Sequence, residues 1–128
     1  MKVVILAGGK GTRISEYTNI LPKPMIKVGS KPILEHILNY YIKFGFKDFI
    51  IASGYKHKII KNYFKKKNLF ANIQVINTGV ETLTGSRLKK LSSLLKQRFM
   101  LTYGDGLSNI NLKKLLNFHI KNKKKITL

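Results

Sequence analysis

Several residue types are scarce or absent in this chain of 128 residues, and each absence excludes something. The chain contains no cysteine, no tryptophan and only five acidic residues. Without cysteine it forms neither disulfides nor thiolate metal sites, which fits the reducing cytoplasm, where we expect the protein to act. No apolar run approaches the roughly 20 residues of a membrane span, and the N-terminus lacks the basic and then apolar pattern of a signal peptide. We therefore expect no membrane partner.

The scarcity of acidic residues leaves a formal net charge of +20. Such an excess is the electrostatic footprint of nucleic-acid binders, which makes nucleic acid a rival partner to consider. Specific readers of bases favour arginine, however, and arginine occurs here only at Arg13, Arg87 and Arg98. The lysine clusters at 65–67 and 123–125 are most simply solvated helix ends, where cations complement the helix dipole. We expect no specific nucleic-acid partner, and nonspecific polyanion binding only as a side effect.

What is present is an alternation of strand and helix patterns. With 44% hydrophobic residues, the chain is long enough for one domain with a buried core. Short β-branched and apolar runs predict strands, and apolar residues three or four positions apart predict amphipathic helices. Strands are predicted at 2–6, 49–52, 73–76 and 99–103, helices at 32–44, 57–67, 86–96 and 112–122, and the start of a further strand at 125–128. Repeated strand-helix units imply an α/β fold with a mostly parallel sheet and helices on both faces.

Ligands of such sheets gather at the carboxyl ends of the strands, so the segments that directly follow predicted strands are the candidate sites. The first is Leu6-Ala7-Gly8-Gly9-Lys10-Gly11-Thr12-Arg13. Its glycines let the backbone take positive φ and let phosphate oxygens approach main-chain N–H groups without meeting a Cβ atom. Thr12 adds a hydroxyl donor, and Arg13 adds a charged fork that matches phosphate geometry. The alternative is a glycine-rich turn with surface cations.

A positioned lysine follows in Pro22-Lys23-Pro24. Each proline fixes its own φ and pushes the preceding residue toward extended conformations, so Lys23 is held in a stiff segment. This lysine, combined with the glycine loop, favours a phosphate-binding site over a plain turn. Neither standard fingerprint matches, because the P-loop needs Gly-Lys-Ser/Thr after four intervening residues and the dinucleotide motif needs a later third glycine.

The second candidate segment, Tyr103-Gly104-Asp105-Gly106, includes the last residue of the predicted strand at 99–103. Asp105 is one of the few carboxylates in the chain, and the flanking glycines leave it accessible. A carboxylate opposite a cationic phosphate loop is what a magnesium–nucleotide site needs, because Mg²⁺ shares its coordination among carboxylate, water and phosphate oxygens. Taken alone, an aspartate before glycine is more often a turn residue, which is the alternative here.

The third candidate segment, residues 77–90, joins a predicted strand to a predicted helix. It contains Thr84-Gly85-Ser86-Arg87. Thr84 or Ser86 can cap the N-terminus of that helix, which is the simplest structural explanation of these residues.

Together, the three segments resemble the sugar-phosphate nucleotidyltransferases, which join a sugar 1-phosphate to a nucleoside triphosphate and release pyrophosphate. The segment from Leu6 to Arg13 matches their N-terminal motif nearly throughout. Thr-x-Thr-Gly-x-Arg-Leu at 82–88, with Tyr103-Gly104-Asp105-Gly106, is most similar to the glucose-1-phosphate cytidylyltransferases. The resemblance implies a Rossmann-like three-layer sandwich, truncated at the C-terminus, with CTP and glucose 1-phosphate as the favoured substrates.

The resemblance also implies roles for individual residues. In-line attack of a sugar 1-phosphate oxygen on the α-phosphorus of the nucleotide demands positioning and charge neutralisation rather than a covalent nucleophile. Arg13 would neutralise the leaving pyrophosphate, Lys23 would steady the α-phosphate and Asp105 would hold Mg²⁺. The residues implied to bind the nucleotide are Leu6, Ala7, Gly8, Gly9, Gly11, Thr12, Gly85, Arg87 and Gly104.

The family continues well past the part that this chain resembles. Its C-terminal half adds sheet strands, most of the sugar pocket and another metal-binding aspartate, none of which is found here. We therefore expect residues 1–128 to be a nucleotide-binding domain that is incomplete at its C-terminal end and that pairs with a complementing C-terminal chain or forms a homo-oligomer. The alternative function is a catalytically inactive nucleotide-binding remnant, or a regulatory domain that lacks the sugar-acceptor half.

Overall fold

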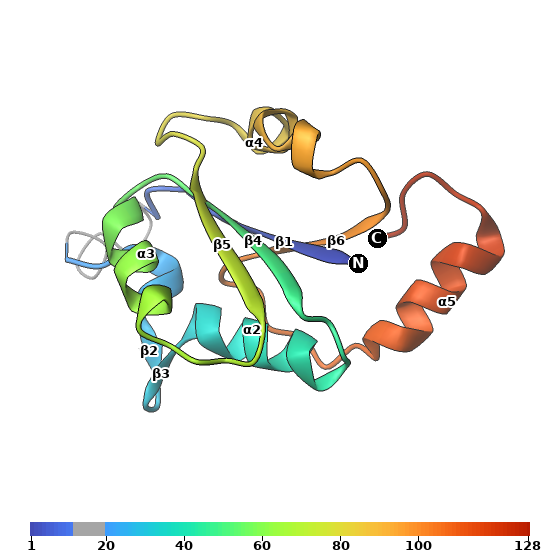
Figure 1. The fold of residues 1–128 in the computed structure, drawn as a ribbon, viewed down its shortest axis with the longest axis horizontal. Coiled ribbons are helices and arrows are strands. Elements are labelled where there is room, and N and C mark those ends of the chain that lie inside the picture. The colour runs from blue at the N-terminus through green and yellow to red at the C-terminus, as the bar shows by residue number, and fades with distance from the viewer. Residues whose placement is uncertain (12–19) are drawn as a thin grey trace.

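The computed structural model describes residues 1–11 and 20–128, and residues 12–19 lie outside its described part. Four parallel strands form the central sheet, in the order β5-β4-β1-β6 (Figure 1). They are β1 (Lys2–Ala7), β4 (Asp48–Ser53), β5 (Asn72–Asn77) and β6 (Phe99–Tyr103). Because all four run in one direction, their carboxyl ends meet at one edge of the sheet, and the three candidate segments follow β1, β5 and β6 at that edge.

The two central strands owe their position to their composition. In β1 and β4 every residue after the first is buried, as expected for near-continuous apolar runs that are covered on both faces. Successive side chains of a strand point to opposite faces. Accordingly, Val3 and Ile5 belong to one core cluster, whereas Val4 and Leu6 belong to the other.

Helices cover both faces of the sheet and complete three layers (Figure 1). On one face lie α2 (Ile33–Lys43) and α3 (His57–Lys65), which bury Leu34, Ile37 and Ile60 in the larger core cluster. On the other face lie α4 (Thr84–Lys90) and the short 3₁₀ helix η3 (Ser92–Leu94), between which Leu91 joins the smaller cluster. The predicted three-layer α/β sandwich with a parallel sheet is confirmed.

The helix predicted at 86–96 begins and ends earlier in the structure than the sequence indicated. Helix α4 begins at Thr84 and its N-cap residue is Leu83, which makes no side-chain cap, so the prediction that Thr84 or Ser86 caps this helix is wrong. The helix ends at Lys90 and passes into η3. The α-helix gives way to the 3₁₀ helix at the buried Leu91, which two serines directly follow. Serine side chains favour local hydrogen bonds over a continuing helix.

Three short elements in the described residues between β1 and α2 were not predicted. The 3₁₀ helix η2 (Lys23–Met25) and the antiparallel pair of β2 (Lys27–Val28) and β3 (Lys31–Pro32) lie between β1 and α2. The turn of this hairpin uses Gly29 at a φ of 64°, a conformation that suits glycine. Elements of two or three residues are too short to produce a periodic pattern of apolar residues, so periodicity cannot reveal them.

Helix α5 (Leu112–Asn122) matches its prediction and stands beside the sheet, beyond β6 (Figure 1). It begins where the Asn111 side chain accepts a hydrogen bond of 3.0 Å from the backbone N–H of Lys114. The strand predicted at 125–128 is wrong for this structure. These residues pair with no strand, and the Thr127 hydroxyl lies instead 2.8 Å from Nδ1 of His119.

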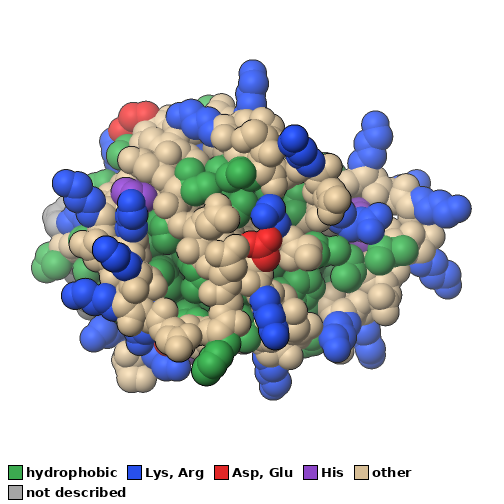
Figure 2. All heavy atoms as spheres, in the orientation of Figure 1, with side chains coloured by type: hydrophobic (Ala, Val, Ile, Leu, Met, Phe, Trp, Pro, Cys, Tyr) green, Lys and Arg blue, Asp and Glu red, His purple; other side chains and the backbone are tan. Residues whose placement is uncertain are grey.

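The surface reflects the excess of basic residues. Lys and Arg side chains project over much of the visible face rather than gathering in a single patch (Figure 2). Among the helices that the structure describes, none is long and apolar enough to cross a membrane.

Candidate functional site

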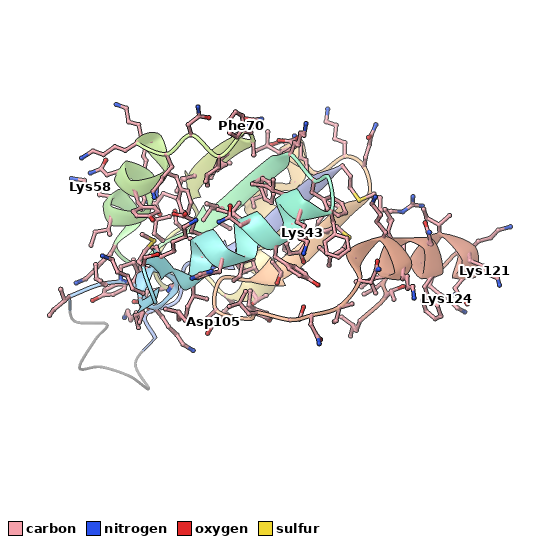
Figure 3. The ribbon with its side chains drawn as sticks, turned by 90° about the horizontal axis from the view of Figure 1, so that it is seen from below. Lys43, Lys58, Phe70, Asp105, Lys121 and Lys124 are labelled. Atoms are coloured by element: carbon pink, nitrogen blue, oxygen red, sulfur yellow. The ribbon has the colours of Figure 1, made fainter. Side chains whose placement is uncertain are left out.

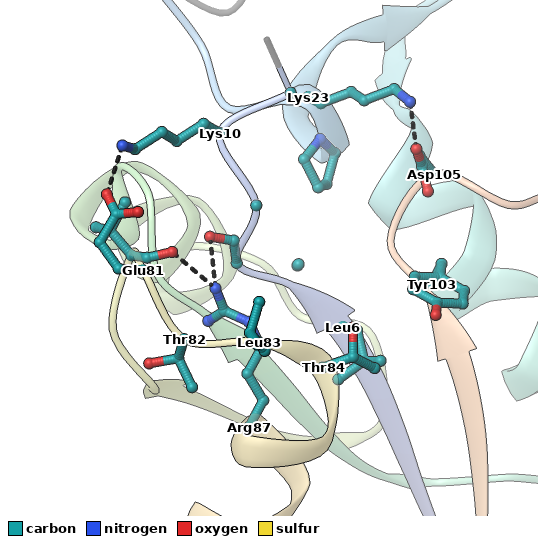
Figure 4. A pocket seen from close by; sticks show the side chains of 16 residues that line it. Leu6, Lys10, Lys23, Glu81, Thr82, Leu83, Thr84, Arg87, Tyr103 and Asp105 are labelled. Atoms are coloured by element: carbon teal, nitrogen blue, oxygen red, sulfur yellow. Dashed lines mark hydrogen bonds and ion pairs between the residues drawn. The ribbon is translucent and has the colours of Figure 1, made fainter. Parts of the chain in front are cut away.

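The carboxyl edge of the sheet is hollowed by a pocket of about 600 Å³ (Figure 4). A volume of this size lies within the ~300–1,000 Å³ that is usual for small-molecule sites. The pocket is lined by the end of β1 and its glycine loop, by η2, by the loop that leads into α4 and by the end of β6. The predicted site residues that it brings together are Leu6, Ala7, Gly8, Gly9, Gly11, Lys23, Arg87 and Asp105.

Of the four remaining predicted residues, two lie outside the described part of the chain and two are described but do not line the pocket. Thr12 and Arg13 fall outside the described residues, so their roles stay predictions. Gly85 lies exposed in the first turn of α4, where an added Cβ atom would meet no atom within 4 Å. Gly104 is buried next to the pocket rather than in its wall.

Gly104 serves a packing purpose at the end of β6. Its backbone N–H donates to the carbonyl of Leu6 at 2.9 Å. An added Cβ atom would lie 3.1 Å from both the Cβ of Ala7 and the Cγ of Pro24. Glycine at this position therefore lets β6, β1 and η2 approach one another, which places Lys23 and Asp105 on the same side of the pocket.

Lys23 and Asp105 form an ion pair between the Nζ and Oδ2 atoms (Figure 4). Both side chains remain partly exposed, at 41% and 34%. Helix η2 supplies the lysine and the turn after β6 supplies the carboxylate, so the pair joins two segments that only the fold brings together. A nucleotide in this pocket would find a cation and a carboxylate adjacent to each other.

The glycine loop is held from both sides at Gly8. Its carbonyl accepts a hydrogen bond from the Tyr55 N–H at 3.1 Å and another from Nη2 of Arg87 at 3.0 Å. An added Cβ atom on Gly8 would collide with the Arg87 guanidinium. At Gly9 an added Cβ atom would meet nothing within 4 Å, and Gly11 has a φ of 66°. The loop therefore needs glycine at position 8 to leave room for the Arg87 guanidinium, whereas Gly9 faces open space.

Arg87 is deeply buried, with 5% of its surface exposed, although it belongs to the pocket lining. Burial lowers the pKa of its guanidinium, which nevertheless stays charged because arginine starts from so high a value. Its terminal nitrogens donate to oxygen atoms of the surrounding loops (Figure 4). The prediction that Arg87 belongs to the nucleotide-binding residues stays a prediction.

The sequence did not reveal every residue at this pocket. Lys10 and Glu81 form an ion pair between the glycine loop and the loop before α4, with Glu81 80% exposed (Figure 4). Tyr103 also lines the pocket and leaves more than half of its side chain exposed. Lys10, Glu81 and Tyr103 each lie in or next to a candidate segment, so their positions in the sequence were the only signal for them. The Lys10–Glu81 ion pair could not be predicted, because it depends on how the two loops fold.

The chain is an α/β protein with a parallel sheet and a glycine-rich pocket at its carboxyl edge, which is where such sheets usually bind small ligands. The family follows from the sequence comparison. A model of the family described as "Nucleotidyl transferase" matches residues 2–128, and the chain belongs to that family.

Two relatives show how far the similarity extends. The chain is 41% identical over 152 aligned positions to a glucose-1-phosphate cytidylyltransferase of Salmonella typhimurium, and the match covers 100% of this chain and 59% of the relative. It is 43% identical over 141 positions to a probable glucose-1-phosphate cytidylyltransferase of Bacillus subtilis, with 93% of this chain and 56% of the relative covered. The chain therefore spans less than two thirds of the length of these relatives.

The fold of this chain is similar to that of a solved structure. The crystal structure of HddC from Yersinia pseudotuberculosis, complexed with GMP-PN, superposes with a TM-score of 0.79 at 28% identity. The match covers 93% of this chain and 54% of the other.

Proposed function

We infer that this chain supplies the nucleotide-binding part of a sugar-1-phosphate nucleotidyltransferase, which joins glucose 1-phosphate to CTP and releases pyrophosphate. The observation that carries this proposal is the pocket at the carboxyl edge of the sheet, where the glycine loop faces the Lys23–Asp105 ion pair. The membership of the nucleotidyl transferase family supports it. A cytoplasmic location goes with the proposal, because nucleotide substrates are found there.

CTP is the proposed nucleotide because the two relatives described above are named cytidylyltransferases. GTP is the nucleotide to compare with it, since the HddC structure was solved with GMP-PN. The two bases differ in size and in hydrogen-bonding edge, so a direct comparison of their affinities distinguishes them.

Each residue at the pocket has its own role in the proposed transfer reaction. Backbone N–H groups of the glycine loop hold the triphosphate, with Gly85 and Gly104 next to the nucleotide. Lys23 steadies the α-phosphate while the sugar phosphate attacks in line, and Arg13 neutralises the leaving pyrophosphate. Removal of one such preorganised charge typically costs ~10²-fold or more in rate.

Asp105 is the proposed protein ligand of a magnesium ion. The donor chemistry fits, because its partly exposed carboxylate lines the pocket and its only ion-pair partner among the described residues is Lys23. Across residues 1–11 and 20–128 there is no cluster of three or more acidic, histidine or cysteine side chains, so one carboxylate would act together with phosphate and water oxygens, as is usual for Mg²⁺. When bound, the ion would neutralise charge on the phosphates.

The sugar-acceptor half is proposed to lie in additional polypeptide. The match to the Salmonella relative supports this view, because it covers only 59% of that relative. The same coverage favours one competing function, a nucleotide-binding remnant or regulatory domain without turnover. We also propose that residues 1–128 form one domain.

Pyrophosphate release separates these two functions. The chain is incubated with CTP, Mg²⁺ and glucose 1-phosphate, alone and with a chain that corresponds to the uncovered part of the Salmonella relative. We expect release that falls about 10²-fold in Lys23→Ala and stays unchanged in Lys43→Ala. Lys43 is a suitable control because it is an exposed lysine on α2, outside the pocket (Figure 3). Binding of CTP without release under either condition would establish the remnant instead.

A further inference from the structure

We propose that Arg87 is a positioning residue that holds the glycine loop in its nucleotide-binding shape through the loop's backbone, and that it makes no contact with the nucleotide itself. This inference rests on the proposed function, because the loop is assigned to the triphosphate there. It gives a structural role to a residue whose side chain lines the pocket but points its donors into the protein.

The guanidinium ties together the carboxyl ends of three neighbouring strands. Nη2 donates to the carbonyls of Gly8, after β1, at 3.0 Å and Val80, after β5, at 3.1 Å. Nη1 donates to the Thr78 hydroxyl at 2.6 Å, to the carbonyl of Gly79 at 2.7 Å and, more weakly, to that of Ser53 at the end of β4 at 3.3 Å. The strands β1, β4 and β5 thus meet at one side chain.

These contacts leave little capacity for a ligand. The two terminal nitrogens of arginine carry four N–H groups, and here they face five protein oxygens, one from each residue just named. A phosphate could bind these nitrogens only by displacing a carbonyl that is buried behind it, and a buried carbonyl without a donor costs free energy. The geometry therefore favours the bonds to the loop over a bond to phosphate.

The position of Arg87 is itself fixed by the helix that carries it. Leu91 lies one turn further along the chain on the same side, is 1% exposed and packs in the cluster with Val4, Leu6 and Ile50. Because that cluster includes residues of β1 and β4, the C-terminal end of α4 is anchored to strands whose ends the guanidinium holds. The arginine fork therefore sits on a rigid support.

The surrounding backbone is shaped to receive the guanidinium. At Gly8 an added Cβ atom would collide with it, and at Gly54 an added Cβ atom would lie 2.9 Å from Nη1. At Gly54 the same atom would also approach the Gly8 carbonyl to 2.8 Å. The nearest atom to that Cβ atom would be the carbonyl oxygen of Gly79, and real Cβ atoms do not come this close. Gly8 therefore leaves the space that Arg87 fills, and Gly54 lets the Gly8 and Gly79 carbonyls, which both accept from Arg87, lie close together.

The guanidinium also brings a charge that no carboxylate cancels. Among the described residues, no acidic side chain forms an ion pair with Arg87. Carbonyl dipoles satisfy its hydrogen bonds but leave a net positive charge behind the glycine loop. That charge favours an anion in the pocket without touching it, since electrostatic attraction between partly buried groups acts across several ångströms.

The test compares Arg87→Lys with Arg98→Lys, because Arg98 is exposed and remote from the pocket lining. Lysine keeps the charge but lacks the fork, so we expect Arg87→Lys to bind CTP with Mg²⁺ at least 10-fold more weakly, and Arg98→Lys to bind within twofold of the unmodified chain. Thr78→Val, which removes the 2.6 Å hydroxyl contact, should weaken binding about threefold and provides the comparison if Arg87→Lys fails to fold. Equal affinity in all variants would overturn the proposal.

Nitrogen NMR of the unmodified chain tests the absence of a nucleotide contact. The guanidinium resonances of Arg87, identified by their loss in Arg87→Lys, should stay in place when CTP saturates the pocket while the Gly9 amide moves. A large shift of the guanidinium resonances on binding, or coupling between them and phosphorus, would show direct contact and overturn the proposal.

Hydrogen exchange keeps this test independent of the proposed function. The Tyr55 N–H bonds to the Gly8 carbonyl, whereas the Gly104 N–H bonds to Leu6 on the other side of β1. In Arg87→Lys we expect the Tyr55 amide to exchange about 10-fold faster and the Gly104 amide to keep its rate. Equal acceleration of both amides, or of neither, would contradict a local positioning role. If the unmodified chain binds no nucleotide, the proposed function fails, and this exchange pattern alone decides the role of Arg87.

Discussion

Lys23 and Asp105, the residues proposed to contact the α-phosphate and the metal, form an ion pair with each other on one side of the pocket. In this arrangement each neutralises the other until a ligand arrives. Exposed ion pairs contribute little to stability, about 0–1 kcal/mol, because water already solvates both charges. The ion pair therefore contributes little to the stability of the fold.

Replacement of Asp105 should separate metal binding from folding. We expect Asp105→Asn to leave the free energy of unfolding within about 1 kcal/mol of the original value, because only an exposed ion pair is lost. The same variant should lose the part of the CTP affinity that depends on Mg²⁺. Calorimetric titrations of CTP with and without Mg²⁺ measure this difference, and a magnesium effect of the original size in Asp105→Asn would exclude the carboxylate as the metal ligand.

Substitution by alanine should lower the stability at Gly8 but not at Gly9. Gly8→Ala places a methyl group where the Arg87 guanidinium lies, so we expect a loss of about 1–3 kcal/mol, as for other overpacked sites. Gly9→Ala adds a methyl group in open space and should change the free energy of unfolding by less than about 0.5 kcal/mol. Urea unfolding of the two variants measures both values. Similar stabilities would mean that the guanidinium is not where the structure has it.

The buried Glu35 should make stability depend on pH. Its carboxylate is 2% exposed and accepts a hydrogen bond of 2.5 Å from Tyr63, with Lys31 and Lys67 each at 3.3 Å. Burial opposes its ionisation, but the hydrogen bonds from Tyr63, Lys67 and Lys31 outweigh burial and hold the pKa of Glu35 below its ordinary value. The resulting stability is complete above the unfolded-state pKa and is lost as the pH falls through the lower folded-state pKa.

Glu35→Gln tests this dependence. At neutral pH we expect it to cost about 2 kcal/mol, since it removes a buried charge from two lysines, and the difference from the original chain should shrink as the solution is made acidic. Glu81→Gln is the matched control, because its side chain is 80% exposed and should have little effect. Free energies of unfolding measured from neutral to acidic pH provide the comparison. A gap between Glu35→Gln and the original chain that does not narrow with acid would refute the assignment.

Strands and helices that are determined by their own residues could be predicted from the sequence. The buried strand after Met1 and helix α5 were predicted because apolar runs and helical spacing are visible within a few residues. The glycine loop and Asp105 were identified as pocket residues because each directly follows a strand of a parallel sheet. The order of the strands then places them at the same edge.

Features that depend on several distant segments could not be predicted in this way. Arg87 was singled out only through the family resemblance, and its burial depends on the convergence of three strand ends around its guanidinium. The Lys23–Asp105 ion pair depends on the close approach that Gly104 permits. The strand expected at 125–128 failed for the same reason, since a strand needs a neighbouring edge that its own sequence does not provide.

In the proposed function, the pocket at the carboxyl edge binds a nucleoside triphosphate through the glycine loop. Titration of the ¹⁵N-labelled chain with CTP and Mg²⁺ tests it most directly. We predict saturable shifts of the Gly8, Gly9 and Gly104 amides, much reduced in Lys23→Ala. Shifts confined to the exposed lysines of α3, or no saturable shift at millimolar nucleotide, would contradict the account.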